Sequence, residues 1–359
     1  MTVKNLHPGL ELQKILDKGN ITQRDFAAKI DVTLSLLNSI LKGNRNITVN
    51  IAVSLEAAGY ETAIVWMERQ INYLISQTKE DEGFQKKTDD ISTWKEIEQL
   101  VPISYFKKEG ILKNDISLDI NTIYDIYNVK SIENISQVIT KYDFRYFRKS
   151  AAFAENKNNV IAWSKLAEYS AKQIKVKAFD KDREQLLIDE LKKCFYKNKD
   201  TVANAEKILK KYGIIFFTLD RPEKTPVDGK SFMLNDSPAI VLSLKYKRLD
   251  NFAFTLLHEL GHVFLHFTKA KYQNISFFVN TSNTEKEENE ANLYARDHLI
   301  DPEIWDNFIF SNFEYDDKVI MEFAEANKVH PGIVRGRICF HFPEYYTKRS
   351  KINLINILS

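Results

Sequence analysis

The stretch that decides the fold of the C-terminal half is FTLLHELGHVFLH, from Phe254 to His266. His258 and His262 are four residues apart, so on a helix their side chains lie about 40° apart on one face. Two imidazoles in this arrangement can bind one tetrahedral metal ion. Glu259 follows the first histidine directly, where its carboxylate can take a proton from a water molecule beside the ion. The other residues are mostly apolar, which is typical of a core helix, and a metal explains the charged groups within it.

A third ligand is expected from the acidic helix that follows, EKEENEANLYARDHL. Spacing alone does not choose among its five carboxylates, Glu285, Glu287, Glu288, Glu290 and Asp297. Glu287, Glu290 and Tyr294 could share one helix face. His266 extends the histidine run, but it lies about 12 Å along the axis from His258, too far for one ion to contact both. We therefore expect His266 to pack in the core or to contact a ligand, not to bind the metal.

The chain divides into four segments by pattern, and together they predict a mostly helical α+β fold. Residues 1–75 contain short amphipathic helices, with Thr22 and Thr33 at positions typical of N-caps, and form a five-helix domain. Residues 76–90 are charged and polar, as in a linker, and residues 91–200 have helical patterning typical of a connector. Residues 201–359 contain two apolar runs, GIIFFTL from Gly213 and SPAIVLSL from Ser237, which predict a small sheet.

Composition excludes several classes of protein. The 359 residues carry a net charge of +2, so any nucleic-acid contact must come from local placement of charge. The two cysteines, Cys194 and Cys339, are far apart and predict reduced, buried thiols. The chain has no apolar run of about 18 residues and no N-terminal signal pattern. We therefore expect a cytoplasmic protein with no membrane partner.

Three stretches in the C-terminal part resemble the ImmA/IrrE family of metallo-endopeptidases. They are RLDNFAFTLLHELGHVFLH, ENEANLYARDHLIDPE and HPGIVRGRI, in the family's order between about residues 200 and 345. The resemblance implies a zincin-like domain in which the glutamate of the Glu-Ala-Asn motif, here Glu290, is the third zinc ligand. Manganese remains an alternative metal. The family usually has more prolines after the second helix than Ile300-Asp301-Pro302 provides, which affects the expected shape of that loop.

The N-terminal domain resembles the HigA-like branch of helix-turn-helix repressors, through HPGLELQKIL and TQRDFAAKIDVTLSLLNSILKGNRNIT. In this pattern the helix Thr33–Leu41 enters the major groove of an operator. Asp31 stands where the turn usually has glycine, and aspartate tolerates the left-handed conformation better than most residues. Residues 1–80 hold nine Lys or Arg against eight Asp or Glu, so a dimerisation module with weak DNA affinity is the alternative. The expected DNA contacts are Gln23, Thr33, Ser35, Asn38, Ser39, Lys42 and Arg45.

Four further residues are candidates for a supporting role at the metal centre. Tyr294 and His298 lie one and two turns beyond Glu290, where either could stabilise an oxyanion. His330 and Arg337, in the last stretch of the resemblance, could line the cleft or orient Glu290. Packing and surface roles are the alternative for each of them.

The two resemblances together imply a regulator that binds DNA as a homodimer and cleaves a protein. The expected substrate is a repressor or antitoxin, the chain itself included, in a stress, phage or toxin–antitoxin response. The alternative is an antitoxin-like repressor whose peptidase fold is a non-catalytic sensor or scaffold. Glu259 distinguishes the two hypotheses, because a purely structural metal site has no use for a general base.

Overall fold

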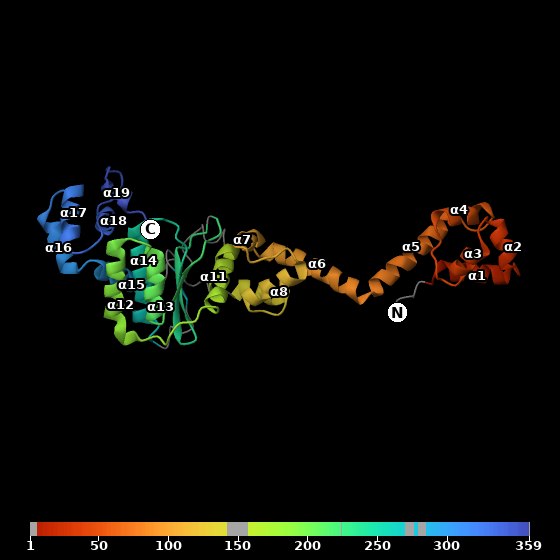
Figure 1. Cartoon of the computed structure of the whole chain (residues 1–359), viewed down its shortest axis with the longest axis horizontal. Helices are drawn as coiled ribbons and strands as arrows, with labels where there is room; N and C mark the ends of the chain where they lie inside the picture. Colours follow the sequence, from red (N-terminus) through yellow and green to blue (C-terminus); the bar gives the residue numbers. More distant parts are fainter. Residues whose placement is uncertain (1–5, 142–156, 224, 270–275, 279–284, 359) are drawn as a thin grey trace. The chain divides into compact units, whose positions relative to one another are not determined.

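The computed structural model describes residues 6–141, 157–223, 225–269, 276–278 and 285–358. The chain forms two compact units, residues 1–93 and 94–359, whose elements are labelled in Figure 1. The predicted mostly helical α+β class, with a small sheet in the C-terminal unit, is confirmed. Among the described residues, no helix has both the length and the apolar character needed to cross a bilayer.

Five helices open the N-terminal unit and enclose one apolar core, which confirms the five-helix prediction. They are α1 (Pro8–Lys18), α2 (Gln23–Lys29), α3 (Leu34–Leu41), α4 (Val49–Ala57) and α5 (Ala63–Glu80). A threonine precedes each of the last four helices, and its hydroxyl accepts a hydrogen bond from the backbone N–H three residues later. These N-caps satisfy backbone donors that the helix leaves free. The predicted caps at Thr22 and Thr33 are therefore confirmed.

Two special backbone positions shape the helix-turn-helix. Asp31, between α2 and α3, has a φ of 56°, so aspartate does adopt the left-handed conformation at this turn. Gly9 in α1 contacts α3 so closely that a Cβ atom there would lie 1.8 Å from the carbonyl oxygen of Ile40. Only glycine permits this approach of the two helices.

The segment 76–90, expected to be a polar linker, is helical. α5 continues to Glu80 and α6 (Glu82–Leu100) begins after the single non-helical residue Asp81. Most side chains of residues 76–90 are exposed. The polar composition correctly indicated that this segment is exposed. It did not indicate irregular structure, because Lys, Glu and Gln are good helix formers.

A four-stranded sheet forms the centre of the C-terminal unit. Its strands are β1 (Ile215–Thr218), β2 (Gly229–Leu234), β3 (Ser237–Leu242) and β4 (Phe277–Phe278), in the order β1-β3-β2-β4. β1 pairs with β3 in parallel, whereas β2 is antiparallel to both β3 and β4. The two apolar runs of the sequence became β1 and β3, and β2 was missed because its sequence GKSFML is partly polar.

The two faces of this sheet pack against different helices, since side chains alternate along each strand. Phe216 and Ile240 belong to the core that also contains α14 (Leu249–Gly261). Phe232 and Val241 face the opposite way, into a core with α11 (Lys157–Ala171). The sheet is therefore the middle of three layers, and Figure 1 shows it between these helices.

The sequence pattern suggested that residues 91–200 are a separate connector. In the structure they are part of the C-terminal unit from residue 94 onward. α7 (Ile103–Lys108), α8 (Ile116–Tyr127), α9 (Ile132–Lys141) and α11 share the second core with the sheet. The fully buried Lys230 of β2 donates hydrogen bonds of 2.6 Å to Ser164 and Glu168 of α11. α12 (Glu184–Lys197) packs instead against α14, and α13 (Thr201–Lys211) packs against α12 and β1 in the same core. The core that contains α14 therefore begins before residue 201.

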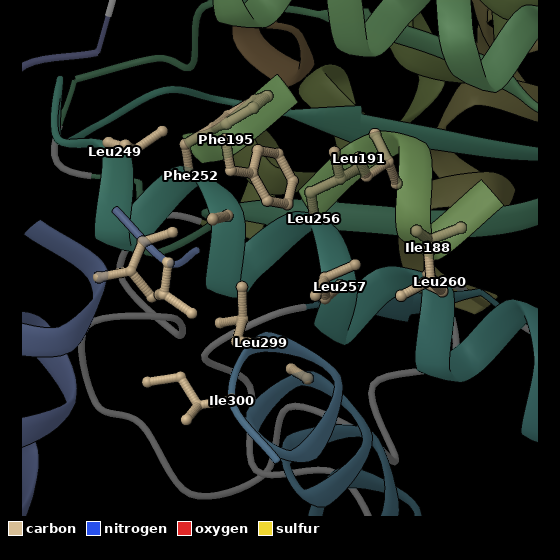
Figure 2. Close-up of a cluster of buried hydrophobic side chains, with 14 of the residues drawn as sticks. Ile188, Leu191, Phe195, Leu249, Phe252, Leu256, Leu257, Leu260, Leu299 and Ile300 are labelled. Atoms are coloured by element: carbon tan, nitrogen blue, oxygen red, sulfur yellow. The ribbon is translucent and has the colours of Figure 1, made fainter. Parts of the chain in front are cut away.

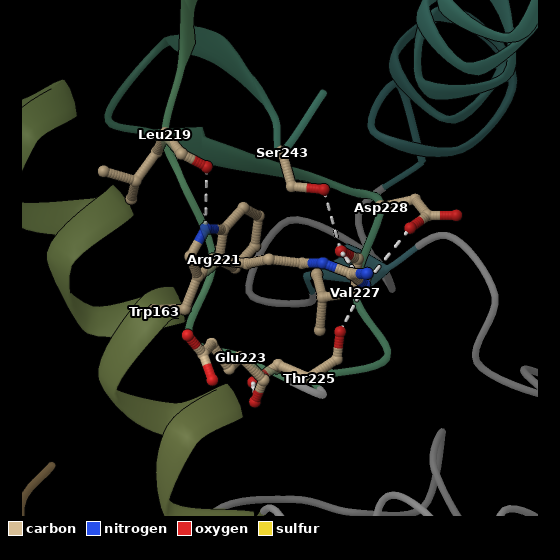
Figure 3. A network of polar contacts seen from close by, with 8 residues as sticks. All are labelled: Trp163, Leu219, Arg221, Glu223, Thr225, Val227, Asp228 and Ser243. Atoms are coloured by element: carbon tan, nitrogen blue, oxygen red, sulfur yellow. Dashed lines mark hydrogen bonds and ion pairs between the residues drawn. The ribbon is translucent and has the colours of Figure 1, made fainter. Parts of the chain in front are cut away.

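A polar network fixes the chain between β1 and β2 (Figure 3). Arg221 donates to the backbone carbonyls of Thr225 and Val227 and pairs with Asp228 at 3.4 Å. Trp163 of α11 donates its indole N–H to the carbonyl of Leu219 at 3.1 Å. These bonds satisfy loop carbonyls that lack strand partners and set the point at which β2 begins.

The remaining helices complete the unit around α14, and the C-terminal ones contact its first turn, where Asn356 bonds to the N–H of Asp250. They are η3 (His262–His266), α15 (Glu285–Leu299), α16 (Pro302–Ser311), α17 (Asp317–Ala326), α18 (Pro331–His341), α19 (Ile352–Ile355) and the short 3-10 turns Lys181–Arg183 and Pro343–Tyr346. The loop in doubt after α15 is short, since Asp301 caps α16 and Pro302 is its first residue. Both cysteines are buried and form no disulfide, as expected.

Candidate metal centre and nucleic-acid interface

α14 and η3 bury the two histidines and Glu259 completely. His258 is 1% exposed, and Glu259 and His262 are 0% exposed. Figure 2 shows the apolar side of α14, where Leu256, Leu257 and Leu260 lie in one cluster with α12 and with Leu299 and Ile300. This packing fixes the helix, so the orientation of its polar side chains is set by the core.

Three residues, His258, His262 and Glu288, direct their donor atoms toward one point between α14 and α15. The Nε2 atoms of His258 and His262 are 3.1 Å apart. One carboxylate oxygen of Glu288 lies 3.1 Å from Nε2 of His262, and the other lies 3.3 Å from Nε2 of His258. In a tetrahedral zinc site with bonds of about 2.0–2.1 Å, donor atoms are about 3.3–3.4 Å apart. Among the described residues, this trio forms a group that could hold a metal ion.

The expected third ligand, Glu290, does not lie at this position. Glu288 and Glu290 are two residues apart, which places them about 200° apart around α15. Glu288 faces the two histidines, whereas the Oε2 atom of Glu290 lies 2.9 Å from Nε2 of His266. The geometry therefore corrects the assignment that followed from the resemblance, and Glu288 replaces Glu290 as the candidate ligand.

Small residues at the helix crossing bring Glu288 to the histidines. A Cβ atom on Gly261 would lie 3.1 Å from both Cα of Ala291 and Cβ of Tyr294. Ala291 and Ala295 are fully buried on the same side of α15. Because neither helix carries a large side chain here, α14 and α15 approach closely enough for the short carboxylate of Glu288 to reach both rings.

Each candidate ligand histidine has a partner at its other ring nitrogen. Nδ1 of His258 is 2.9 Å from the Oδ1 atom of Asn292, which can only accept. Nδ1 of His262 is 2.9 Å from Nδ1 of His266. These bonds leave Nε2 of both rings directed toward Glu288, as metal sites require. His266 thus contacts a candidate ligand, one of the two roles expected for it.

Glu259 is the main test of whether a metal fits this site. Both of its carboxylate oxygens are buried without a hydrogen-bond partner among the described residues. Burial raises the pKa of Glu259 well above its ordinary value, the Ser231 hydroxyl and Lys230 oppose this rise, and the charge of Glu288 adds to it. An unsatisfied buried carboxylate is costly. A cation and a water molecule beside it would remove this cost, so the residues present fit a metal.

Electrostatics give His262 and Glu288 the protonation states that a metal needs. Burial lowers the pKa of His262 to about 4, although Glu288 opposes the shift, so the ring is neutral at pH 7. Burial alone would raise the pKa of Glu288, but hydrogen bonds and charge from His258 and His262 lower it to about 2. A neutral imidazole and an ionised carboxylate are the forms that bind zinc.

The surface of α3 collects most of the residues expected to contact DNA. Thr33 caps the helix and is exposed, and Arg45 is exposed just beyond it. Gln23 is half-buried and donates a hydrogen bond of 2.9 Å to Gln13 of α1. A shallow surface hollow is lined by Leu34, Ser35, Asn38, Ser39, Lys42 and Asn44. The polar side of the helix is therefore accessible over its whole length.

Comparisons with known proteins find two domains in this chain. Residues 209–338 match the model of a peptidase family described as the IrrE N-terminal-like domain, and residues 12–58 match a helix-turn-helix model. The chain thus joins a helix-turn-helix domain to an IrrE-like peptidase domain. A crystal structure from Nostoc punctiforme, described as an antidote protein of a plasmid maintenance system, is 25% identical, with a TM-score of 0.23. It covers 25% of this chain and 98% of its own. No curated protein matches.

Four residues of the IrrE-like domain expected to support the metal centre have other contacts. Tyr294 donates a hydrogen bond of 2.7 Å to Glu184 of α12, and His298 packs on Tyr294 and bonds its carbonyl. His330 caps α18 by accepting from the N–H of Gly332. Arg337 donates to the carbonyls of Arg296 and Ile300 at the end of α15. None of these contacts reaches the trio, but Arg337 does fix the helix that carries Glu288.

Sequence reasoning missed three residues around the metal centre of the IrrE-like domain. Asn292 could have been found, because it lies four residues after Glu288 on the same helix face. Ser231 and Phe277 gave no indication, since β2 and β4 were not expected. Phe277 pairs with Ser231 across the strands, and its ring stacks on His262 with centroids 4.1 Å apart.

Proposed function

We propose that this protein is a DNA-binding transcriptional regulator whose IrrE-like domain is a zinc-dependent endopeptidase. Its proposed substrate is a repressor or antitoxin-type protein, with the chain itself as one candidate, in a stress, phage or toxin–antitoxin response. A homodimer bound to an operator would hold the peptidase near promoter-bound substrates and raise their effective concentration. The metallopeptidase-type domain and the helix-turn-helix domain support this proposal.

The observation that carries the proposal is the environment of Glu259. Its buried carboxylate has no hydrogen-bond partner among the described residues. Glu259 is also the residue directly after His258, one of the three candidate ligands. A domain that used the metal only as a structural support would have four protein ligands and no buried, unsatisfied base. The geometry thus favours catalysis over a non-catalytic scaffold.

In the proposed reaction, His258, His262 and Glu288 would hold the zinc ion. Zinc, when bound, supplies Lewis-acid activation of the scissile carbonyl and of a water molecule. Glu259 accepts the proton of the attacking water, and the apolar surroundings that raise its pKa make it a stronger base. It then returns the proton to the leaving amine. Asn292 and His266 keep the rings of the two histidines oriented throughout.

The test compares Glu259→Gln with Glu288→Gln in the full chain. Glu259→Gln should keep about one equivalent of zinc, because it removes a base and no ligand, and should lower cleavage by at least about 10². Glu288→Gln should lose zinc affinity first and cleavage as a consequence. Zinc content is measured on the purified proteins, and cleavage is read as new protein N-termini in cells that express each variant.

A matched control is Glu322→Gln, which removes an exposed carboxylate of α17 in the same unit. It should behave as the wild type in both measurements. Cleavage by Glu259→Gln at the wild-type rate would refute the endopeptidase. Full zinc retention by a His258→Ala, His262→Ala double variant would refute the site itself.

A further inference from the structure

The ring nitrogen of His262 that faces away from Glu288 contacts His266, which in turn contacts Glu290. Its Nδ1 atom lies 2.9 Å from Nδ1 of His266, and Nε2 of His266 lies 2.9 Å from Oε2 of Glu290. We propose that His266 and Glu290 are positioning residues, which form a hydrogen-bonded relay that fixes the tautomer and ring orientation of His262 and thereby tightens metal binding. The proposal rests on the zinc site proposed above.

The relay has one consistent arrangement of protons once His262 binds a metal through Nε2. Nδ1 of His262 then carries the proton and donates it to Nδ1 of His266, which must accept. The proton of His266 is therefore on Nε2, where it is donated to the carboxylate of Glu290. Each group determines the tautomer of the next, so the anionic Glu290 selects the state in which His262 presents a free Nε2 lone pair.

The surroundings of His266 favour a fixed ring. Its side chain is 0% exposed, and its ring centroid lies 5.0 Å from that of His262 and 5.2 Å from that of Phe277. Glu290 is 36% exposed at the end of the relay, with Lys286 3.9 Å away. An ionised acceptor makes the last hydrogen bond stronger than a neutral one would be.

The two histidines of the trio are supported differently. Nδ1 of His258 bonds to the neutral amide of Asn292, whereas the chain behind His262 ends in a carboxylate. An imidazole whose distal N–H points toward a negative charge is a more basic ligand. The relay therefore predicts that His262 contributes more to metal affinity than His258 does.

The experiment measures the zinc affinity of the full chain by competition with a fluorescent chelator at fixed pH. Outer partners of metal-bound histidines typically change affinity about 10- to 100-fold. His266→Phe, which fills the space but accepts no hydrogen bond, should weaken zinc binding by that factor. His266→Gln retains an acceptor oxygen and should recover part of the loss. Glu290→Gln, one step further away, should weaken binding about fivefold.

A double variant separates a relay from independent effects. Because Glu290 acts through His266, adding Glu290→Gln to His266→Phe should cause no further loss. Glu322→Gln again provides the charge control, and the unfolding temperature of the zinc-free proteins reports any structural damage. Glu290 is half-buried and lies outside the apolar core, so Glu290→Gln keeps the test decisive if His266→Phe unfolds.

Two results would overturn the relay. One is wild-type zinc affinity in Glu290→Gln, and the other is an additional, additive loss in the double variant. Both differ from failure of the proposed function, in which the wild-type protein itself would bind no zinc at this site. The cobalt-substituted protein gives a second readout, since His266→Phe should change the visible absorption of the metal by altering the His262 ligand.

Discussion

Replacing Gly261 by alanine should loosen the metal centre although alanine is the better helix former. The new Cβ atom would lie 3.1 Å from Cα of Ala291, 3.1 Å from Cβ of Tyr294 and 3.2 Å from its Cγ. Ordinary contacts at such a position are 3.4–4 Å. One of the two nearest atoms, Cα of Ala291, is backbone, so α15 must move away from α14 by a few tenths of an ångström.

Two opposing effects set the change in stability. Alanine in place of glycine favours a helix by about 0.8–1.0 kcal/mol. Overpacking of a well-packed contact costs about 1–3 kcal/mol. Ala291 and Tyr294 are both buried, at 0% and 7% exposed, so the overpacking should win. We expect the free energy of unfolding to fall by about 0–2 kcal/mol, the difference of these two ranges.

The effect on zinc affinity should be clearer than the effect on stability. Glu288 lies three residues before Ala291 and moves with α15. Metal–ligand distances tolerate deviations of only about 0.2 Å, so a shift of this size should weaken zinc binding about tenfold. Chelator competition measures the affinity. Scanning calorimetry measures stability, with the transitions of the two units fitted separately.

Gly83→Ala is the matched control, because Gly83 lies in α6 and a Cβ atom there would meet only the side chain of Asp81, at 3.3 Å. It should bind zinc as the wild type does and gain up to about 1 kcal/mol. The reasoning is refuted if Gly261→Ala is as stabilised as this control and binds zinc with unchanged affinity.

Three further predictions concern the DNA surface, the turn and the end of α15. Lys42→Ala and Arg45→Ala should each weaken binding to all duplexes and lower the salt slope by about one, as measured by fluorescence anisotropy; unchanged slopes would exclude phosphate contacts. Asp31→Gly should stabilise the N-terminal unit by up to about 1 kcal/mol and Asp31→Val destabilise it by about 1–2 kcal/mol in thermal unfolding, and the reverse order would contradict the role of the φ of 56°. Arg337→Met removes the donor to the carbonyls of Arg296 and Ile300, and the first of these still accepts from the N–H of Ile300. The loss of a partner for Ile300 should cost about 1–3 kcal/mol in denaturant unfolding, whereas an unchanged midpoint would show that this carbonyl finds another partner.

The N-terminal domain was predictable because its determinants are local. Each threonine cap lies directly before the helix that it caps, and the helix faces follow from apolar spacing within about ten residues. Asp31 illustrates the same point, since its left-handed conformation depends on the turn alone. The HELGH segment was predictable for a similar reason, because His258 and His262 are neighbours on one helix.

The role of residues 91–200 was not predictable because it depends on contacts between distant segments. Helical periodicity indicates which side of α11 is apolar, but gives no information on which element covers it. The polar sequence of β2 concealed a strand whose Lys230 is buried against Glu168 and Ser164, more than 60 residues earlier. A buried lysine in a strand has no pattern of its own, and it is stable there only because the partners from α11 satisfy it.

The choice between Glu288 and Glu290 depends on helical phase, and the sequence does contain the phase. Tightly crossing helices need small residues at their contact, and α15 has two, Ala291 and Ala295, one turn apart. Glu288 lies three and seven residues before them, on the same face, while Glu290 is rotated by about 100° from Ala291. The resemblance pointed to Glu290 by its position in the motif. The face of α15 that packs against α14 is instead the one that carries Ala291 and Ala295. A carboxylate next to an alanine on the chain is therefore a weaker candidate ligand than one a full turn away from it.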